Sequence, residues 1–158
     1  MGVQYSDNDY HLQEVMCMDN LAEKLRSHRL KVTPQRLAIL TVLTQTTKHP
    51  DAENIYQTLR ETHPSISLAT VYKTLDTLKN AGLILELNAG EDSFRYDANT
   101  QPHVHLVCAK CRQVFDATET ESASFRTFLD DFSSKMAFET DYALLLLFGQ
   151  CTQCPNAS

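Results

Sequence analysis

Four of the five cysteines form two Cys-x-x-Cys pairs, Cys108 with Cys111 and Cys151 with Cys154. Four thiolates are a ligand set of structural zinc, and each short turn supplies two of them from one loop. A single pair would be weak evidence, because it could equally be a redox-active dithiol. Two pairs in one small chain predict a structural four-cysteine zinc site, with two disulfides or redox dithiols as the alternative. Cys17 has no such partner and is interpreted as a bystander thiol.

Histidines and aspartates form a second set of possible metal ligands. His103 and His105 are two residues apart, so on a strand both imidazoles point to the same face. His49, Asp97 and Asp116 are isolated in the sequence, and each of them taken alone is typical of a loop or a solvated surface. The His-x-His pair indicates a metal site, and its nitrogen donors suit Fe(II), Mn(II) or Zn(II) better than thiophilic metals.

The rest of the chain has to fold so that it holds these side chains. Its 158 residues are enough for one domain of ordinary size or two small ones. Hydrophobic residues make up 42% and charged residues 22%, so the chain can build a core. No apolar run approaches the ~20 residues that cross a bilayer, and the N-terminus lacks the pattern of a secretory signal. We therefore expect a cytoplasmic protein that does not interact with a membrane.

The net charge of −6 argues against nucleic-acid binding, but the charge is distributed unevenly. Residues 21–86 carry nine basic and six acidic side chains, whereas residues 87–158 carry five basic and ten acidic ones. A mildly basic segment thus lies between acidic ones. Such a segment can bind DNA weakly and with strong salt dependence, and dimerisation would strengthen the binding.

Helix signals dominate the first half of the chain after a polar arm at residues 1–19. Asn20 with Glu23 has the spacing of a capping box, and Thr33 followed by Pro34 is a strong helix start. Asp51 is the expected cap of a third helix. Ser67 is the expected cap of a fourth helix over residues 68–80, whose apolar stripe is Leu68, Val71, Leu75 and Leu78.

A β-hairpin is predicted directly after these helices, with strands over 83–87 and 93–97 and a glycine-containing turn between them. Three helices followed by a hairpin are the parts of a winged helix-turn-helix. In that motif the exposed face of the second helix of the pair enters the major groove, and the hairpin reaches the flanking backbone.

The second half is predicted to be a small α+β module. After a linker at 99–102, strands are expected over 103–109 and 114–117, and Phe125, Phe128, Leu129 and Phe132 indicate a helix. The apolar run over 142–148 predicts a central strand and invites burial in an oligomer interface. The predicted organisation is an arm at 1–19, a DNA-binding domain at 20–98, the linker and a second domain at 103–158.

Taken together, these motifs resemble the ferric uptake regulator superfamily of bacterial metal-dependent repressors. The resemblance runs from about residue 20 to 154. Its carriers are Val32-Thr33-Pro34-Gln35-Arg36, His49-Pro50, Ser67-Leu68-Ala69-Thr70-Val71-Tyr72-Lys73-Thr74-Leu75, His103-Val104-His105-Leu106-Val107-Cys108-Ala109-Lys110-Cys111 and Cys151-Thr152-Gln153-Cys154.

The resemblance implies a homodimer with a winged-helix DNA-binding domain and an α+β dimerisation domain. It assigns the four paired cysteines to structural zinc. It also implies a regulatory Fe(II) or Mn(II) site that joins the two domains, with His49, Asp97, His103, His105 and Asp116 as ligands. Metal would then favour the DNA-binding arrangement of the domains, because it binds the conformation in which its ligands converge.

Within the superfamily, Asp97 and Asp116 resemble the peroxide-responsive subgroup, since iron-sensing members usually carry glutamate near both positions. Val104 also replaces an acid that iron-sensing members often place between the two histidines. The resemblance implies that bound Fe(II) reduces peroxide, that the oxidant attacks His49 or His103, and that the protein then releases DNA and derepresses oxidative-stress genes. With Mn(II), which reacts poorly with peroxide, repression would persist.

DNA reading is assigned to the helix at 68–80. The candidate contacts are Tyr72, Lys73, Thr70, Thr74 and, for the backbone, Arg36. A dimer would require double-stranded operator DNA with an inverted repeat, whose half-sites lie about one turn (34 Å) apart.

Three alternatives stay open at this point. The nearest is an iron-, manganese- or zinc-sensing repressor that does not respond to peroxide. A metalloenzyme is disfavoured, because the sequence shows no additional acid–base pair, and the expectation is that the protein is not an enzyme. The third is a zinc-stabilised interaction module that binds no DNA.

Overall fold

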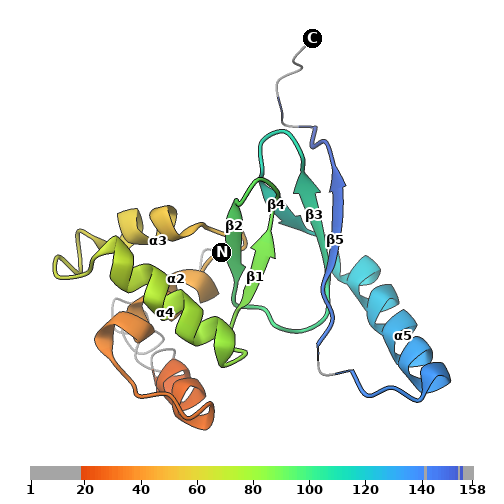
Figure 1. Cartoon of the computed structure of the whole chain (residues 1–158), viewed down its shortest axis with the longest axis horizontal. Coiled ribbons are helices and arrows are strands. Elements are labelled where there is room, and N and C mark those ends of the chain that lie inside the picture. Colours follow the sequence, from red (N-terminus) through yellow and green to blue (C-terminus); the bar gives the residue numbers. More distant parts are fainter. Residues whose placement is uncertain (1–18, 141, 153, 155–158) are drawn as a thin grey trace, which may run out of the picture.

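The computed structural model describes residues 19–140, 142–152 and 154, and it has an α+β architecture (Figure 1). Four helices and a two-stranded hairpin make up the first part of the described chain, and a three-stranded sheet with one long helix makes up the second. The α+β class predicted from the sequence is confirmed. Cys17 and nearly all of the predicted arm lie outside the described residues.

The helices of the first part begin where the capping residues predicted them. Thr33, Asp51 and Ser67 each accept a hydrogen bond from the backbone N–H three residues further on, at 3.3, 2.7 and 3.1 Å. The helices that they cap are α2 (Pro34–Thr44), α3 (Ala52–Leu59) and α4 (Leu68–Asn80).

One predicted cap is wrong. The helix before α2 occupies residues 19–27 of the described chain, so Asn20 lies inside it instead of capping it. Two of its buried side chains, Leu21 and Leu25, still lie four residues apart and pack against the other helices.

The hairpin consists of β1 (Leu85–Asn88) and β2 (Phe94–Asp97), which pair antiparallel. It is attached to the helical core through Tyr96, which is buried there and donates its backbone N–H to the carbonyl of Pro50 at 3.1 Å. Three helices followed by a hairpin is the order expected for a winged helix-turn-helix. The attachment places the end of β2 close to the segment before α3.

The sheet of the second part has the strand order β4-β3-β5. Strand β3 (Val104–Cys108) is central, antiparallel to β4 (Val114–Asp116) and parallel to β5 (Leu145–Gly149). Helix α5 (Glu119–Met136) connects β4 to the segment before β5. The prediction that the apolar run at 142–148 forms a central strand is wrong: β5 is an edge, because β3 is the one strand it pairs with among the described residues.

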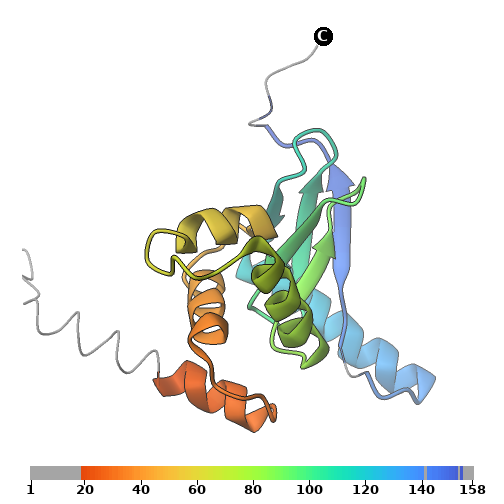
Figure 2. The same cartoon turned by 60° about the vertical axis from the view of Figure 1, so that its left-hand side comes forward.

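The hairpin packs against this sheet and so connects the two parts. Leu87 and Ala89, at the end of β1 and in the turn, form a small core with Val107 of β3 and Val114 of β4. Both views show the hairpin between the helices and the sheet (Figures 1 and 2). None of the helices in the described part of the chain is long and apolar enough to span a membrane.

Candidate metal centres

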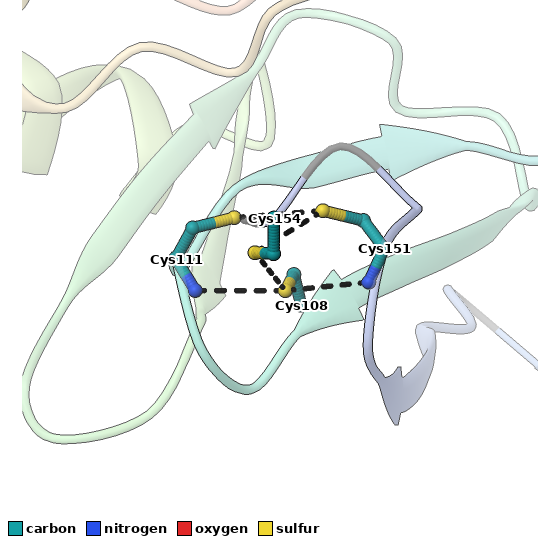
Figure 3. Close-up of side chains that lie close together, drawn as sticks. All are labelled: Cys108, Cys111, Cys151 and Cys154. Atoms are coloured by element: carbon teal, nitrogen blue, oxygen red, sulfur yellow. Dashed lines mark hydrogen bonds between the residues drawn. The ribbon is translucent and has the colours of Figure 1, made fainter. Parts of the chain in front are cut away.

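The four paired cysteines gather at one end of the sheet (Figure 3). Cys108 ends β3 and Cys111 lies in the turn that follows, while Cys151 and Cys154 come directly after β5. The Sγ atoms of Cys108 and Cys154 are 3.4 Å apart, those of Cys111 and Cys151 are 3.8 Å apart, and those of Cys151 and Cys154 are 3.4 Å apart. The 39 residues between Cys111 and Cys151 thus bring the second cysteine pair back beside the first, at the end of β3.

These separations fit one zinc ion and not a disulfide. A disulfide joins its sulfurs at about 2.05 Å, and all four cysteines are free. Four sulfurs that surround a zinc ion tetrahedrally at about 2.3 Å lie about 3.8 Å from one another. The four-cysteine set therefore suits structural zinc, which would join the ends of β3 and β5.

The thiols also have the proton chemistry of a metal site. Backbone N–H groups of Cys111 and Cys151 donate to the sulfur of Cys108 at 3.5 and 3.4 Å, and they lower the pKa of that thiol to about 5. The pKa of the Cys154 thiol is raised to about 12 by the neighbouring sulfurs of Cys108, Cys111 and Cys151. Four thiolates repel one another at this distance, so a divalent cation is needed to hold all four.

The second cluster joins five side chains from separate elements. His49 precedes α3, Asp97 ends β2, His103 and His105 lie at the start of β3 and within it, and Asp116 ends β4. One ligand atom from each of the five lies within 4.8 Å of all the others. The sheet register places His105 directly opposite Asp116, and the attachment of the hairpin to the helical core brings Asp97 to His49.

Each of the three imidazole Nε2 atoms lies close to one carboxylate oxygen of Asp97 and to one of Asp116. The Nε2 atoms of His49, His103 and His105 lie 3.0, 3.2 and 3.7 Å from Oδ1 of Asp116. They lie 3.5, 3.1 and 3.3 Å from Oδ2 of Asp97. Ligands at right angles around one ion at about 2.1 Å are about 3.0 Å apart, so the short distances are those of neighbouring ligands.

The hydrogen bonds of the cluster support the same interpretation. The Nε2 atoms of His49 and His103 are buried and make no hydrogen bond, although carboxylate oxygens are close. Nδ1 of His103 is 2.8 Å from the backbone carbonyl of Gln101, so it carries the proton and leaves the Nε2 lone pair to the cluster. Two buried nitrogens without partners beside two carboxylates fit a divalent ion with nitrogen and oxygen ligands.

Charge within the cluster changes the proton affinity of its members. The carboxylates of Asp116 and Asp97 raise the pKa of His103 to about 10. Burial alone would lower the pKa of His49, but the same two carboxylates raise it to about 9. Burial would raise the pKa values of Asp97 and Asp116, yet the histidines hold both well below the ordinary range. Without an ion the cluster therefore keeps protons on imidazoles, and a divalent ion would replace them.

Three of the five residues assigned to DNA contact lie on the outside of α4 or at its start. Tyr72 and Lys73 are exposed, and the Tyr72 hydroxyl donates to Glu53 at 2.9 Å. Thr70 is half-buried, and its hydroxyl pairs with the capping hydroxyl of Ser67 at 2.8 Å. Arg36, on α2, is half-buried and donates to the carbonyl of Lys31 at 2.7 Å.

The assignment of Thr74 to DNA contact is wrong. Its side chain is 7% exposed, because it follows Val71 by three residues and precedes Leu78 by four on the buried face of α4. The sequence also did not point to Gln101. Its contribution to His103 comes from a backbone carbonyl, which every residue type carries, so no pattern of side chains could have revealed it.

A model of the ferric uptake regulator family matches residues 27–148. The chain belongs to this family. It is 32% identical over 158 residues to the peroxide-responsive repressor PerR of Staphylococcus epidermidis, covering 98% of this chain and 97% of the relative. The family assignment made from the motifs is confirmed.

Two solved structures extend the family likeness to three dimensions. The peroxide stress regulator of Campylobacter jejuni is 33% identical with a TM-score of 0.69, over 85% of this chain and 98% of that one. A ferric uptake regulator from Pseudomonas aeruginosa, solved with manganese, is 28% identical with a TM-score of 0.70, over 83% and 97%. Members of the ferric uptake regulator family are metal-responsive transcription regulators, and the two donor sets described above suit zinc and iron or manganese.

Proposed function

We propose that the chain is a dimeric bacterial repressor that binds operator DNA while its His/Asp cluster holds Fe(II) or Mn(II), and that peroxide inactivates it through oxidation of a ligand histidine. The observation that carries the proposal is the convergence of five donors from both parts of the chain. The two parts would act as a DNA-binding domain over 20–98 and a dimerisation domain over 103–158, joined by 99–102.

The cluster can act as a switch because its members belong to elements that can separate. His49 is attached to the helices and Asp97 to the hairpin, whereas His103, His105 and Asp116 belong to the sheet. The five donors meet only when the hairpin and the segment before α3 lie against the sheet. Occupancy of the cluster therefore fixes the position of α4 relative to the sheet, and differential affinity for that arrangement shifts the population toward it.

The surfaces needed for DNA binding and dimerisation lie on opposite parts of the chain. Tyr72 and Lys73 face outward on α4, where a thymine methyl and a guanine edge or phosphate could be read. Strands β3 and β5 and helix α5 expose large apolar side chains, which a second copy would cover. They are Leu106, Phe128, Phe132, Met136, Leu147 and Phe148.

When bound, Fe(II) supplies the electron transfer that activates hydrogen peroxide, which Mn(II) does not do readily. In the net change, one peroxide oxygen is added to an imidazole carbon and the other leaves as water, so the ring loses two electrons and the peroxide gains them. His49 and His103 are the expected targets, as the resemblance to the peroxide-responsive repressors implies. An oxidised ring is a poorer ligand, so the five donors separate and DNA is released.

The test loads the zinc-containing dimer with Fe(II), adds hydrogen peroxide, and follows operator binding by fluorescence anisotropy and added oxygen by peptide mass spectrometry. We expect oxygen on the peptides with His49 or His103, in parallel with loss of DNA binding. The Mn(II)-loaded protein is the control and should keep both its mass and its DNA. Metal-dependent DNA binding without any histidine oxidation would contradict peroxide sensing.

Metal-dependent DNA binding without histidine oxidation would support the second candidate function, a repressor that senses the metal alone. One comparison favours it: the manganese-bound regulator from Pseudomonas aeruginosa is as similar in structure as the peroxide stress regulator, with TM-scores of 0.70 and 0.69. Dependence of operator affinity on Fe(II) or Mn(II) concentration, unchanged by peroxide, would identify this function.

A further inference from the structure

A pocket of about 300 Å³ is lined by both carboxylates of the His/Asp cluster, those of Asp97 and Asp116. Its walls include Thr44 at the end of α2, Thr46 and Thr47 in the segment after it, and Asn99 beyond β2. The pocket is therefore built by the same segments that bring His49 and Asp97 to the sheet.

The cluster is open to solvent on this side. The side chains of His49, His103 and His105 are 1%, 5% and 0% exposed, and that of Asp97 is 10% exposed. The side chain of Asp116 is 32% exposed, and both carboxylates line the pocket. A small molecule that reaches the cluster without unfolding the chain would pass the carboxylate of Asp116.

Of the three threonine hydroxyls in the lining, two are engaged in hydrogen bonds with the protein and one is not. Thr44 donates its hydroxyl to the carbonyl of Leu40 at 3.0 Å, and Thr46 accepts from the N–H of Lys48 at 3.1 Å. The hydroxyl of Thr47 makes no hydrogen bond within the described part of the chain. A free hydroxyl in a pocket that two carboxylates also line suits a small neutral molecule that both donates and accepts hydrogen bonds.

We propose that this pocket is the entrance to the regulatory site, used by the metal ion and by hydrogen peroxide, and that the Thr47 hydroxyl holds the peroxide there before it reacts. The second half of this inference rests on the peroxide-sensing function proposed above, whereas the entrance itself does not. The two carboxylates attract a divalent cation to the pocket, and hydrogen peroxide, which is neutral, meets no electrostatic barrier there.

Two substitutions separate passage through the pocket from docking in it. Thr47→Leu places a larger apolar side chain at the wall, so it should slow every entering species. Thr47→Val keeps the shape and removes the hydroxyl, so it should affect the peroxide alone. Thr47 is exposed, hence both variants should fold, and Thr58→Leu on the exposed face of α3 is the matched control.

Two rates are measured on zinc-containing dimer. The first is the release of Mn(II) to an excess of chelator, followed by electron paramagnetic resonance. The second is the rate of histidine oxidation in the Fe(II)-loaded protein, followed by mass spectrometry at limiting peroxide. Equilibrium Mn(II) affinity is determined in parallel and should stay unchanged in all variants, because none of them removes a ligand.

For Thr47→Leu we expect both rates to fall together, by about tenfold, relative to Thr58→Leu. For Thr47→Val we expect unchanged Mn(II) release and oxidation slower by about 2- to 10-fold, the rate equivalent of one hydrogen bond. Release and oxidation rates of Thr47→Leu that equal those of the control would overturn the entrance. Equal oxidation rates in Thr47→Val and wild type would overturn the docking role.

Failure of the proposed function gives a different result. If the wild-type protein with Fe(II) gains no oxygen at all, peroxide sensing and the docking of peroxide at Thr47 both fall. The entrance is then decided by the Mn(II) release rates alone, which need no peroxide.

Discussion

At the scale of single residues, the two donor sets differ in what holds them in place. The cysteines lie in two short turns, and backbone N–H groups of the same turns stabilise the Cys108 thiolate. The ligands of the His/Asp cluster come from separate elements, and backbone groups orient two of them: the carbonyl of Gln101 contacts His103, and the N–H of Asn99 donates to Asp97. We therefore expect the zinc site to tolerate changes elsewhere and the regulatory site to depend on each of its members.

Replacing Asp116→Asn should lower Mn(II) affinity at least about tenfold, since loss of even an outer partner of a metal ligand costs this much. The substitution keeps the size of the side chain and removes the charge that faces all three imidazoles. Mn(II) titration followed by electron paramagnetic resonance measures the effect. Zinc content should not change, and Asp130→Asn on α5 is the control. Equal Mn(II) affinity in both variants would remove Asp116 from the site.

At the scale of elements, the helix starts depend on single capping side chains and the hairpin depends on its contacts to both parts. Arg112 links the hairpin turn, Ala89–Ser93, to the turn that carries Cys111. It forms an ion pair with Glu91 at 2.6 Å and donates to the carbonyl of Ala89 at 3.3 Å. Gly90 has a φ of +94°, and a Cβ there would collide with the Arg112 guanidinium. These contacts couple the position of the hairpin turn to that of the zinc-binding turn.

Ser67→Ala should lower the free energy of unfolding by about 1 kcal/mol, the usual effect of removing an N-cap. Ser67 accepts from the Thr70 N–H at 3.1 Å, at the start of the helix assigned to DNA reading. Urea denaturation of the zinc-loaded protein should show a lower midpoint with an unchanged slope. Ser124→Ala, inside α5, removes a serine that caps nothing and should not destabilise the protein.

Arg112→Ala should loosen the hairpin turn without affecting the zinc site. The reason is that Arg112 makes both polar contacts between this turn and the cysteine turn described above, whereas its side chain contributes no metal ligand. Amide hydrogen exchange should become faster at residues 89–93, with the zinc content unchanged. Lys135→Ala removes an ion pair within α5 and is the control. Unchanged exchange at the turn would show that the apolar contacts of Leu87 and Ala89 suffice.

At the scale of the whole molecule, zinc and the proposed dimer interface involve the same sheet. Strand β5 is held by β3 on one side, while Leu147 and Phe148 are 49% and 56% exposed. The zinc-binding turns join the ends of these two strands. Loss of zinc should therefore release β5, and with it the surface that a second copy would cover.

Removal of zinc with a strong chelator should convert the dimer to monomer and leave the α2–α4 core folded, because that core contains no cysteine. Sedimentation velocity measures the assembly, and circular dichroism measures the retained helix. If the protein remains dimeric after zinc removal, the sheet and its dimer surface do not depend on the metal.

Phe148→Asp should weaken the dimer by placing a charge in the apolar surface, and Tyr72→Ala should leave the dimer intact and weaken operator binding. Sedimentation velocity and fluorescence anisotropy distinguish the two effects. A dimeric Phe148→Asp variant with normal DNA binding would place the interface elsewhere.

The sequence alone determined the features that depend on short stretches of chain. These are the two Cys-x-x-Cys turns, the caps at Thr33, Asp51 and Ser67, and the order of helices and strands, because capping and periodicity involve residues a few positions apart. The motifs also led to the correct family. The five regulatory ligands could be named from that resemblance, but nothing local in His49 or Asp116 distinguishes a ligand from a surface residue.

The tertiary structure decided what depends on packing between distant segments. It brought His49 and Asp97 to the sheet, because Tyr96 anchors the hairpin in the helical core and Leu87 packs against β3. It buried Thr74 and left β5 at an edge, since both outcomes depend on which surfaces find a partner. It also created the pocket at Thr47, whose walls are far apart in the chain and meet only when the two parts close over the ligands.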